Sequence, residues 1–277
     1  MAIHHCEYKV FSQWGEDGIL DWLVNKIPGI PRSFIEFGVE DYTESNTRLL
    51  LLQKNWNGLV IDGSKKNINS IKSSDIYWKH NLKAIQAFIT KDNINEIFLD
   101  NGYKDDVGIL SIDIDGNDYF VWESISVINP IIVVCEYNAV LGDLLALSIP
   151  YEPNFVRTKS HYSNLYFGAS IWALVCLGKR KGYTFIGTTS TGANAFFIRN
   201  DHADLIIPLL KNVSAFPSKF REARDENGDL QFASGNNRKE IIKNLPFLNL
   251  NTNKVAPLGS FGEIYSSSWQ KGESVNL

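Results

Sequence analysis

The fold is decided by the stretch Phe34-Ile-Glu-Phe-Gly-Val-Glu-Asp-Tyr-Thr-Glu-Ser-Asn46 and by Leu59-Val-Ile-Asp62, which comes shortly after it. The first apolar run ends in Glu36-Phe-Gly38, and an apolar-periodic segment, residues 47–53, follows the turn. This order predicts a strand, a tight glycine turn, a helix and a second strand that carries an acid at its carboxyl end.

An acid in the place of Asp62 predicts a bound ribose, because one carboxylate can accept hydrogen bonds from both ribose hydroxyls. The turn before it lacks the GxGxxG pattern, and its single glycine, Gly38, offers too few backbone amides to cradle a pyrophosphate. An adenosine cofactor without phosphates fits this pattern better. S-Adenosylmethionine (SAM) is therefore the expected cofactor.

Strand and helix patterns alternate five times, which predicts a doubly wound α/β fold with a mostly parallel sheet. The expected strands are residues 33–37, 58–62, 76–80, 107–113 and 130–136. Tyr183-Thr-Phe-Ile-Gly187 and Ala195-Phe-Phe-Ile-Arg199 follow as a closing hairpin. Residues 1–277 are expected to form a single domain, with an N-terminal helix (12–27), a substrate lid (139–167) and a polar C-terminal extension (201–277). The extension either wraps the domain or contacts a partner subunit of a homo-oligomer.

Composition sets the class of protein. The chain has 277 residues, of which 44% are hydrophobic, so a substantial core is expected. The net charge of −4 argues against nucleic acid as a partner. No apolar run reaches the roughly 20 residues that a membrane span needs. The N-terminus shows no secretion signal and the three cysteines no disulfide or zinc pattern, so a cytoplasmic location is expected.

Acidic residues follow the fourth and fifth expected strands. Asp113-Ile-Asp-Gly-Asn-Asp118 places three carboxylates within six residues, and Glu136-Tyr-Asn138 closes the next strand. Oxygen ligands from Asp115, Glu136 and Asn138 would suit a hard divalent ion, Mg²⁺ or Mn²⁺. The alternative is loop capping, with Asp118 as the N-cap of the next helix. The sequence alone leaves both interpretations open.

Two further side chains are candidates for the same site. His161 lies in a polar loop, where a histidine is usually only solvated, but it could reach the cleft as a general base. Trp14 belongs to the core or lines the cofactor cleft. No GxSxG motif and no neighbouring cysteine–histidine pair indicates nucleophilic catalysis.

Taken in order, several motifs resemble the FkbM-like branch of class I SAM-dependent methyltransferases, over roughly residues 10–245. They are Ser12-Gln-Trp-Gly-Glu-Asp17, Phe34-Ile-Glu-Phe-Gly38, Ser45-Asn46, Leu110-Ser-Ile-Asp-Ile-Asp-Gly-Asn-Asp-Tyr119, Cys135-Glu-Tyr-Asn138, Tyr166-Phe-Gly-Ala-Ser170 and Gly192-Ala-Asn-Ala-Phe-Phe197. The resemblance implies a seven-stranded Rossmann-like sheet whose last strand is antiparallel. It also implies methyl transfer to a hydroxyl of a sugar, a nucleotide-linked sugar or a natural product, with or without a metal, as in surface-polysaccharide tailoring.

The resemblance also assigns roles to single residues. The SAM-binding residues would be Gln13, Glu36, Phe37, Gly38, Asn46, Asp62 and Asp113. Asp115 would be a catalytic residue beside His161, and it matches the metal-binding acid of metal-dependent relatives, with Glu136 and Asn138 near the partner ligands. The lid would contact the acceptor through Tyr162, Asn164 and Tyr166. The turn departs from the family pattern, because Gly38-Val-Glu-Asp-Tyr42 has only one glycine.

Two rival functions use the same residues. An NAD(P)-dependent oxidoreductase acting on a nucleotide sugar would use Asp62 equally well, but the chain lacks a pyrophosphate loop and a Tyr-xxx-Lys pair. A binding protein that keeps the fold without chemistry is the other rival. The acid cluster argues against it, since burying carboxylates without a use lowers stability.

Overall fold

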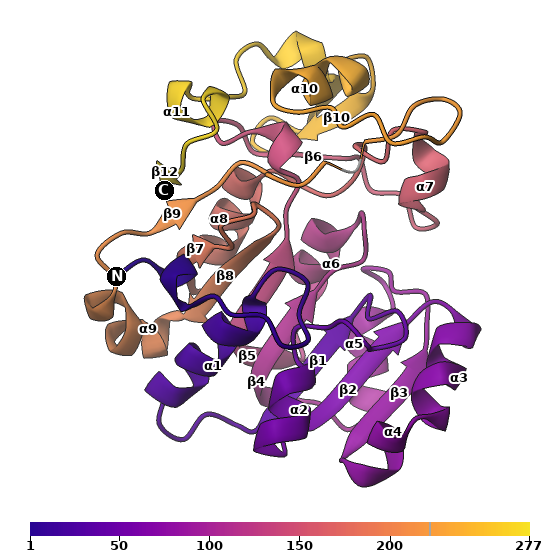
Figure 1. The fold of residues 1–277 in the computed structure, drawn as a ribbon, viewed down its shortest axis with the longest axis vertical. Coiled ribbons are helices and arrows are strands. Elements are labelled where there is room, and N and C mark those ends of the chain that lie inside the picture. Colours follow the sequence, from indigo (N-terminus) through magenta and orange to yellow (C-terminus); the bar gives the residue numbers. More distant parts are fainter. Residues whose placement is uncertain (222) are drawn as a thin grey trace.

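The computed structural model describes residues 1–221 and 223–277, and its centre is a seven-stranded sheet in the order β3-β2-β1-β4-β5-β8-β7 (Figure 1). These strands are β1 (Ser33–Phe37), β2 (Asn57–Asp62), β3 (Leu82–Gln86), β4 (Asp105–Ile112), β5 (Ile128–Glu136), β7 (Tyr183–Thr188) and β8 (Asn194–Arg199). β8 pairs antiparallel with β5 and β7, and the other neighbours are parallel. The predicted Rossmann-like sheet with an antiparallel last strand is confirmed.

Helices cover both faces of this sheet, which explains why its central strands are mostly apolar. One face packs against α1 (Glu16–Lys26), α2 (Arg48–Lys54), α3 (Lys65–Ser73) and α9 (Asn200–Ile206). The other packs against α5 (Ile94–Asp100), α6 (Asp118–Ser124) and α8 (Ile171–Arg180). Successive residues of one strand serve opposite faces: Phe34 belongs to the first core and Ile35 to the second.

One predicted strand is wrong. Residues 76–80 do not extend but lie in α4 (Asp75–Lys79) and its C-cap, and the strand follows at Leu82–Gln86. The apolar side chains of α4 do not form a buried face, since Trp78 is 73% exposed. Leu82 and Ala84, by contrast, are buried at the alternate spacing of a strand.

The segment 139–167 and the C-terminal extension form a cap together. The segment contains η2 (Ala139–Leu141), β6 (Leu147–Ser148) and α7 (Arg157–Ser160), and the extension contains η3 (Ile207–Leu209), β9 (Ser214–Ala215), α10 (Asn236–Ile242), β10 (Pro246–Asn249), β11 (Lys254–Pro257), η4 (Leu258–Phe261), α11 (Ser267–Gln270) and β12 (Val275–Asn276). β10 pairs with both β6 and β11, so the two segments share a small sheet. Figure 1 shows β6, α7, β10, α10 and α11 at the top of the molecule, beyond the main sheet, whereas β9 and β12 lie beside β7.

Side chains of the extension fix this cap. The Tyr265 hydroxyl donates to the Val140 carbonyl at 2.6 Å, and the Trp269 indole donates to the Ala139 carbonyl at 3.2 Å. The polar tail therefore folds back onto the 139–167 segment of its own chain. Within the described ranges, no helix has the length and apolar character that crossing a membrane requires.

Candidate functional site

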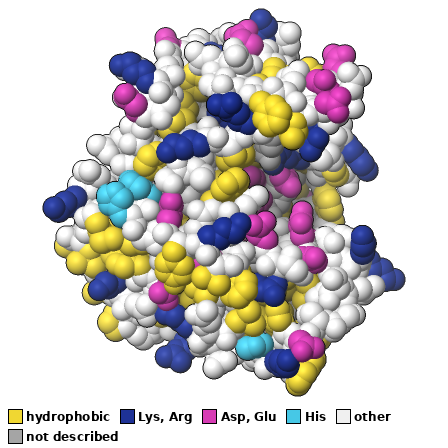
Figure 2. Space-filling view, viewed as in Figure 1, with side chains coloured by type: hydrophobic (Ala, Val, Ile, Leu, Met, Phe, Trp, Pro, Cys, Tyr) yellow, Lys and Arg dark blue, Asp and Glu magenta, His cyan; other side chains and the backbone are white. Residues whose placement is uncertain are grey.

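A cavity of about 470 Å³ lies at the carboxyl ends of the central strands, between the sheet and the cap. It is bordered by Phe37 of β1, Asp62 of β2 and Glu136 of β5, with Phe155 and Arg157 from the cap. This is the switch point where strand order reverses between β1 and β4, the usual ligand position in open α/β sheets. Figure 2 shows acidic side chains gathered in the hollow below the cap.

The residues predicted to bind the cofactor all line this cavity: Gln13, Glu36, Phe37, Gly38, Asn46, Asp62 and Asp113. Seven of the described lining residues are acidic, and one, Arg157, is basic. The acids are Glu36, Glu40, Glu44, Asp62, Asp113, Asp115 and Glu136. The cavity therefore favours a positively charged or neutral ligand over a phosphate.

Asp62 is held in one orientation at the end of β2. Its Oδ2 accepts from the Glu40 amide at 2.9 Å, and its Oδ1 accepts from the Ser64 amide at 2.7 Å and from Asn67 Nδ2 at 3.1 Å. Each carboxylate oxygen can accept more than one hydrogen bond, so capacity for a ligand hydroxyl remains. Phe88, which follows β3 in the chain, also lines the cavity. The carboxylate with this ring suits a ribose that carries a flat base.

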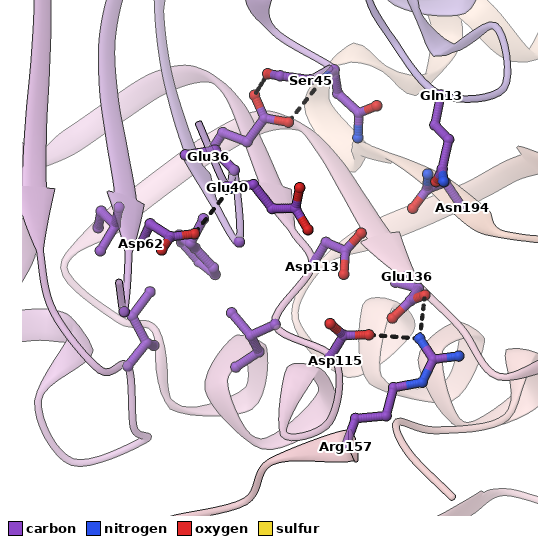
Figure 3. Close-up of a pocket in the computed structure, with 18 of the residues that line it drawn as sticks. Gln13, Glu36, Glu40, Ser45, Asp62, Asp113, Asp115, Glu136, Arg157 and Asn194 are labelled. Atoms are coloured by element: carbon purple, nitrogen blue, oxygen red, sulfur yellow. Dashed lines mark hydrogen bonds and ion pairs between the residues drawn. The ribbon is translucent and has the colours of Figure 1, made fainter. Parts of the chain in front are cut away.

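Glu36 anchors the loop between β1 and α2. Its carboxylate accepts from the Asn46 amide at 2.8 Å, from the Thr47 amide at 3.1 Å and from the hydroxyls of Ser45 and Thr47 (Figure 3). Burial raises the pKa of this carboxyl, and these hydrogen bonds oppose that rise. The helix begins at Arg48, because the residues before it turn to hold the acid. A carboxyl group thus already occupies the turn that leads into α2.

The loop ahead of α1 presents Trp14 to the cavity beside Gln13. Asp17 accepts from the amides of Val10, Phe11 and Ser12 at 2.7–2.8 Å, which fixes the loop. Trp14 lines the cavity, in agreement with one of the two interpretations of the sequence. Its ring stacks on Phe220 of the extension, with ring centres 5.4 Å apart. The motif at residues 12–17 therefore builds one wall of the site.

Three carboxylates meet at the ends of β4 and β5. Asp113, Asp115 and Glu136 each offer an oxygen within 4.8 Å of the others. Burial raises the pKa of the Asp113 carboxyl well above its usual range, and the charges of Asp115 and Asp118 raise it further. Burial, followed by the charges of Asp113 and Asp115, does the same for Glu136. The carboxyls of Asp113 and Glu136 therefore hold a proton more tightly than a solvent-exposed acid does.

Arg157 also lies at this cluster, although no sequence pattern predicts it there. Its Nη1 lies 2.6 Å from Asp115 Oδ1 and 4.0 Å from Glu136 Oε1 (Figure 3). Arg157 is separated by 42 positions from Asp115, in a polar segment without helical periodicity. Only the three-dimensional contact between α7 and the strand ends brings it here.

Asn138 and Asp118 have structural roles. The Asn138 amide donates to the carbonyls of Leu165 and Phe167 at 2.9 Å and accepts from the Val140 amide at 3.0 Å. It is buried and is not among the described residues that line the cavity, so its position gives no support to the predicted metal ligand. Asp118 is not the N-cap of α6, which is Asn117; its carboxylate instead accepts from amides of the preceding loop.

The predicted base and lid contacts lie elsewhere. His161 does not appear among the described lining residues, its Nδ1 pairs with Ser163 Oγ at 2.8 Å, and burial lowers its pKa. Tyr162, Asn164 and Tyr166 are likewise outside the described lining. The Tyr166 hydroxyl donates to the Pro246 carbonyl at 2.8 Å, joining the two parts of the cap. The position of His161 gives no support to its predicted role as base.

The raised pKa of Glu136 has a consequence for stability. Its folded-state pKa lies above the unfolded value of about 4.3, so the protein loses stability as the pH rises through this interval. We expect Glu136→Gln to be more stable than the wild type at pH 8 and equal to it near pH 4. The difference should grow by up to about 1.4 kcal/mol per pH unit.

Urea denaturation at pH 4, 6 and 8 measures this effect. Glu123→Gln is the control, because Glu123 is exposed and pairs with Arg180 at the surface. Its stability difference from the wild type should not change with pH in this way. A Glu136→Gln protein that is less stable than the wild type at pH 8 would show that Arg157 more than offsets the burial of the charge.

The comparisons with known proteins give structural similarity at low sequence identity. No family model matches the chain, and no curated protein matches its sequence. The N-terminal domain of EvdMO1 with SAH bound is 9% identical, with a TM-score of 0.43 over 66% of this chain and 79% of that one. The O-methyltransferase from Bacillus cereus in complex with SAH is 15% identical, with a TM-score of 0.42 over 66% and 78%. An S-adenosylmethionine-dependent methyltransferase from Clostridium acetobutylicum ATCC 824 is 11% identical, with a TM-score of 0.41 over 69% and 92%.

Proposed function

We propose that this chain is a SAM-dependent O-methyltransferase of the FkbM-like type, acting on a hydroxyl of a sugar or a related small molecule. The observation that carries the proposal is the buried Glu36 carboxyl in the turn that leads into α2. In dinucleotide-binding folds the pyrophosphate lies at the amino end of this helix. Here the Glu36 carboxylate accepts hydrogen bonds from the backbone amides of Asn46 and Thr47. A pyrophosphate would find these amides already bonded to carboxyl oxygens, whereas SAM, with its positive sulfonium and ammonium, does not need them.

The cavity divides between cofactor and acceptor. Asp62 would hold the ribose hydroxyls, and Asp113 would face the amino end of the methionine. The acceptor would lie at the other end, near Asp115 and Glu136, against the aromatic wall of Trp14 and Phe220. An aromatic face beside carboxylates suits a polyhydroxylated ring, which stacks through its C–H groups and donates hydrogen bonds. The excess of acids disfavours an acceptor that carries phosphates.

The reaction would be an in-line displacement at the sulfonium methyl. The acceptor oxygen attacks the methyl carbon from about 3 Å, the carbon–sulfur bond breaks, and its electron pair returns to sulfur. The hydroxyl proton passes to a carboxylate. Glu136 suits this role best, because burial and the neighbouring charges raise its pKa. Asp115 would orient the acceptor hydroxyl.

The residues present do not fit a divalent ion held by Asp115, Glu136 and Asn138, one of the two interpretations that the sequence leaves open. Of the three predicted ligands, Asn138 uses its amide to tie down backbone. The remaining two, Asp115 and Glu136, face the guanidinium of Arg157. A Mg²⁺ or Mn²⁺ ion would have to share them with a positive charge. We therefore derive the chemistry from the side chains alone.

Calorimetry with SAM and with NAD⁺ tests the proposal. We expect SAM to bind, NAD⁺ not to bind, and Asp62→Ala to weaken SAM binding about 10- to 100-fold, since a charged acceptor of two hydroxyls is lost. Asp75→Ala is the control, because Asp75 is exposed, pairs with Lys79 in α4 and is not among the described residues that line the cavity. Absence of SAM binding at millimolar concentration, or tighter binding of NAD⁺, would contradict the proposal.

A further inference from the structure

We propose that Arg157 is the resident cation of the carboxylate cluster formed by Asp113, Asp115 and Glu136, a positioning residue that takes the place of a divalent ion. The proposal builds on the proposed function only in the use of the cluster as the acceptor end of the site. The Arg157 guanidinium offsets the negative charge of these carboxylates, so that no bound cation is needed for this purpose.

The guanidinium is fixed from several sides. Nη1 donates to Asp115 at 2.6 Å, and Nε donates to the Asn164 carbonyl at 2.8 Å. Its Cζ lies over the Phe167 ring, 3.7 Å from the ring centre. The Arg157 side chain is only 11% exposed. A guanidinium packed on an aromatic ring and held through separate donors is pre-organised, unlike a surface lysine that samples many positions.

The cluster needs such a charge. Three carboxylates within 4.8 Å repel one another, and in a partly buried cavity this repulsion is stronger than in water. Glu136 Oε2 is buried and has no hydrogen-bond partner in the described part of the chain, so the attraction of a nearby cation is its main compensation. Arg157 lies close enough to lower the pKa values of both Asp113 and Glu136, against the larger effects that raise them.

The arrangement also links the cap to the sheet. Arg157 is the first residue of α7, within the 139–167 segment, and Asp115 follows β4. Asp115 has a left-handed backbone, with φ of +56°, and is otherwise exposed. The ion pair therefore sets the direction of the Asp115 carboxylate and holds the cap segment over the acceptor end of the cavity.

Manganese binding distinguishes a resident guanidinium from a vacant metal site. Titration of the full chain with MnCl₂, followed by electron paramagnetic resonance of unbound Mn²⁺, should show no binding to the wild type at millimolar concentration. Arg157→Met should acquire a site, because the same carboxylates then lack their cation. The double variant Arg157→Met with Asp115→Asn should lose it again, and Arg157→Lys, which keeps the charge, should not acquire it.

The control is Arg180→Met, which removes the same charge from a surface pair with Glu123 and should not create a site. A wild type that binds Mn²⁺ through Asp115 and Glu136 would overturn the proposal, and so would a folded Arg157→Met that binds none. If Arg157→Met does not fold, the wild-type and Arg157→Lys titrations still decide. Calorimetry with SAM on the same samples separates the two proposals, since loss of SAM binding would not alter the manganese result.

Discussion

Gly38→Ala is expected to prevent stable folding of the chain. Gly38 has φ of +74°, and a Cβ placed on it would lie 1.5 Å from the Asp113 carbonyl oxygen. That oxygen belongs to the backbone at the end of β4, so no rotamer change can relieve the clash. We expect a loss of at least about 4 kcal/mol in the free energy of unfolding, the range in which single substitutions unfold small domains. Urea denaturation followed by circular dichroism measures it.

Gly29→Ala is the matched control for this prediction. Gly29 has nearly the same conformation, with φ of +72°, but a Cβ there would meet no atom within 4 Å. It should therefore show only the cost of a left-handed alanine, about 1 kcal/mol. Equal losses in the two variants would mean that conformation, and not the contact between the β1 turn and Asp113, makes glycine necessary at position 38.

Much of the fold follows from the sequence, because the central strands are buried on both faces and show unbroken apolar runs. The run at Leu59–Val–Ile–Asp62 gives both the strand and the acid at its end. The third strand was misplaced because Ile76 and Trp78 look like strand residues, although their segment lies on the surface as a helix. Strand propensity depends on a residue and its neighbours in sequence, whereas burial depends on which distant segments pack over it.

The site follows less completely. Acids at strand ends are predictable, because parallel strands end at one edge of the sheet. The other residues that line the cavity are less predictable, since Arg157 and Phe220 come from segments distant in sequence. Asn138 illustrates the reverse error: it follows the right strand, but its side chain turns to hold Leu165 and Phe167. Contacts between segments distant in sequence decide which polar residues near a strand end face the ligand.

Glu36→Ala is expected to cost about 4 kcal/mol of unfolding free energy, the second of the large effects. Its carboxylate is the acceptor for two amides and two hydroxyls of residues 45–47, all in a buried environment. Alanine leaves these donors without an acceptor, at about 1–3 kcal/mol for each group that water cannot reach. Glu44→Ala is the control from the same loop. Glu44 is half exposed and pairs with Lys9 at 2.8 Å, so we expect less than about 0.5 kcal/mol.

This experiment also separates the two roles that Glu36 can have. If Glu36 chiefly contacts the cofactor, the ligand-free Glu36→Ala variant should be as stable as the wild type, and only its affinity for SAM should fall. If Glu36 anchors the loop, its removal should lower the stability of the ligand-free protein. The affinity for SAM should then fall as well, because Asn46 loses its position. Denaturation of the ligand-free variant therefore decides, and a Glu36→Ala protein as stable as the wild type would contradict the anchor. The hydrogen bonds favour the anchor, because the amides and hydroxyls of residues 45–47 already converge on this carboxylate.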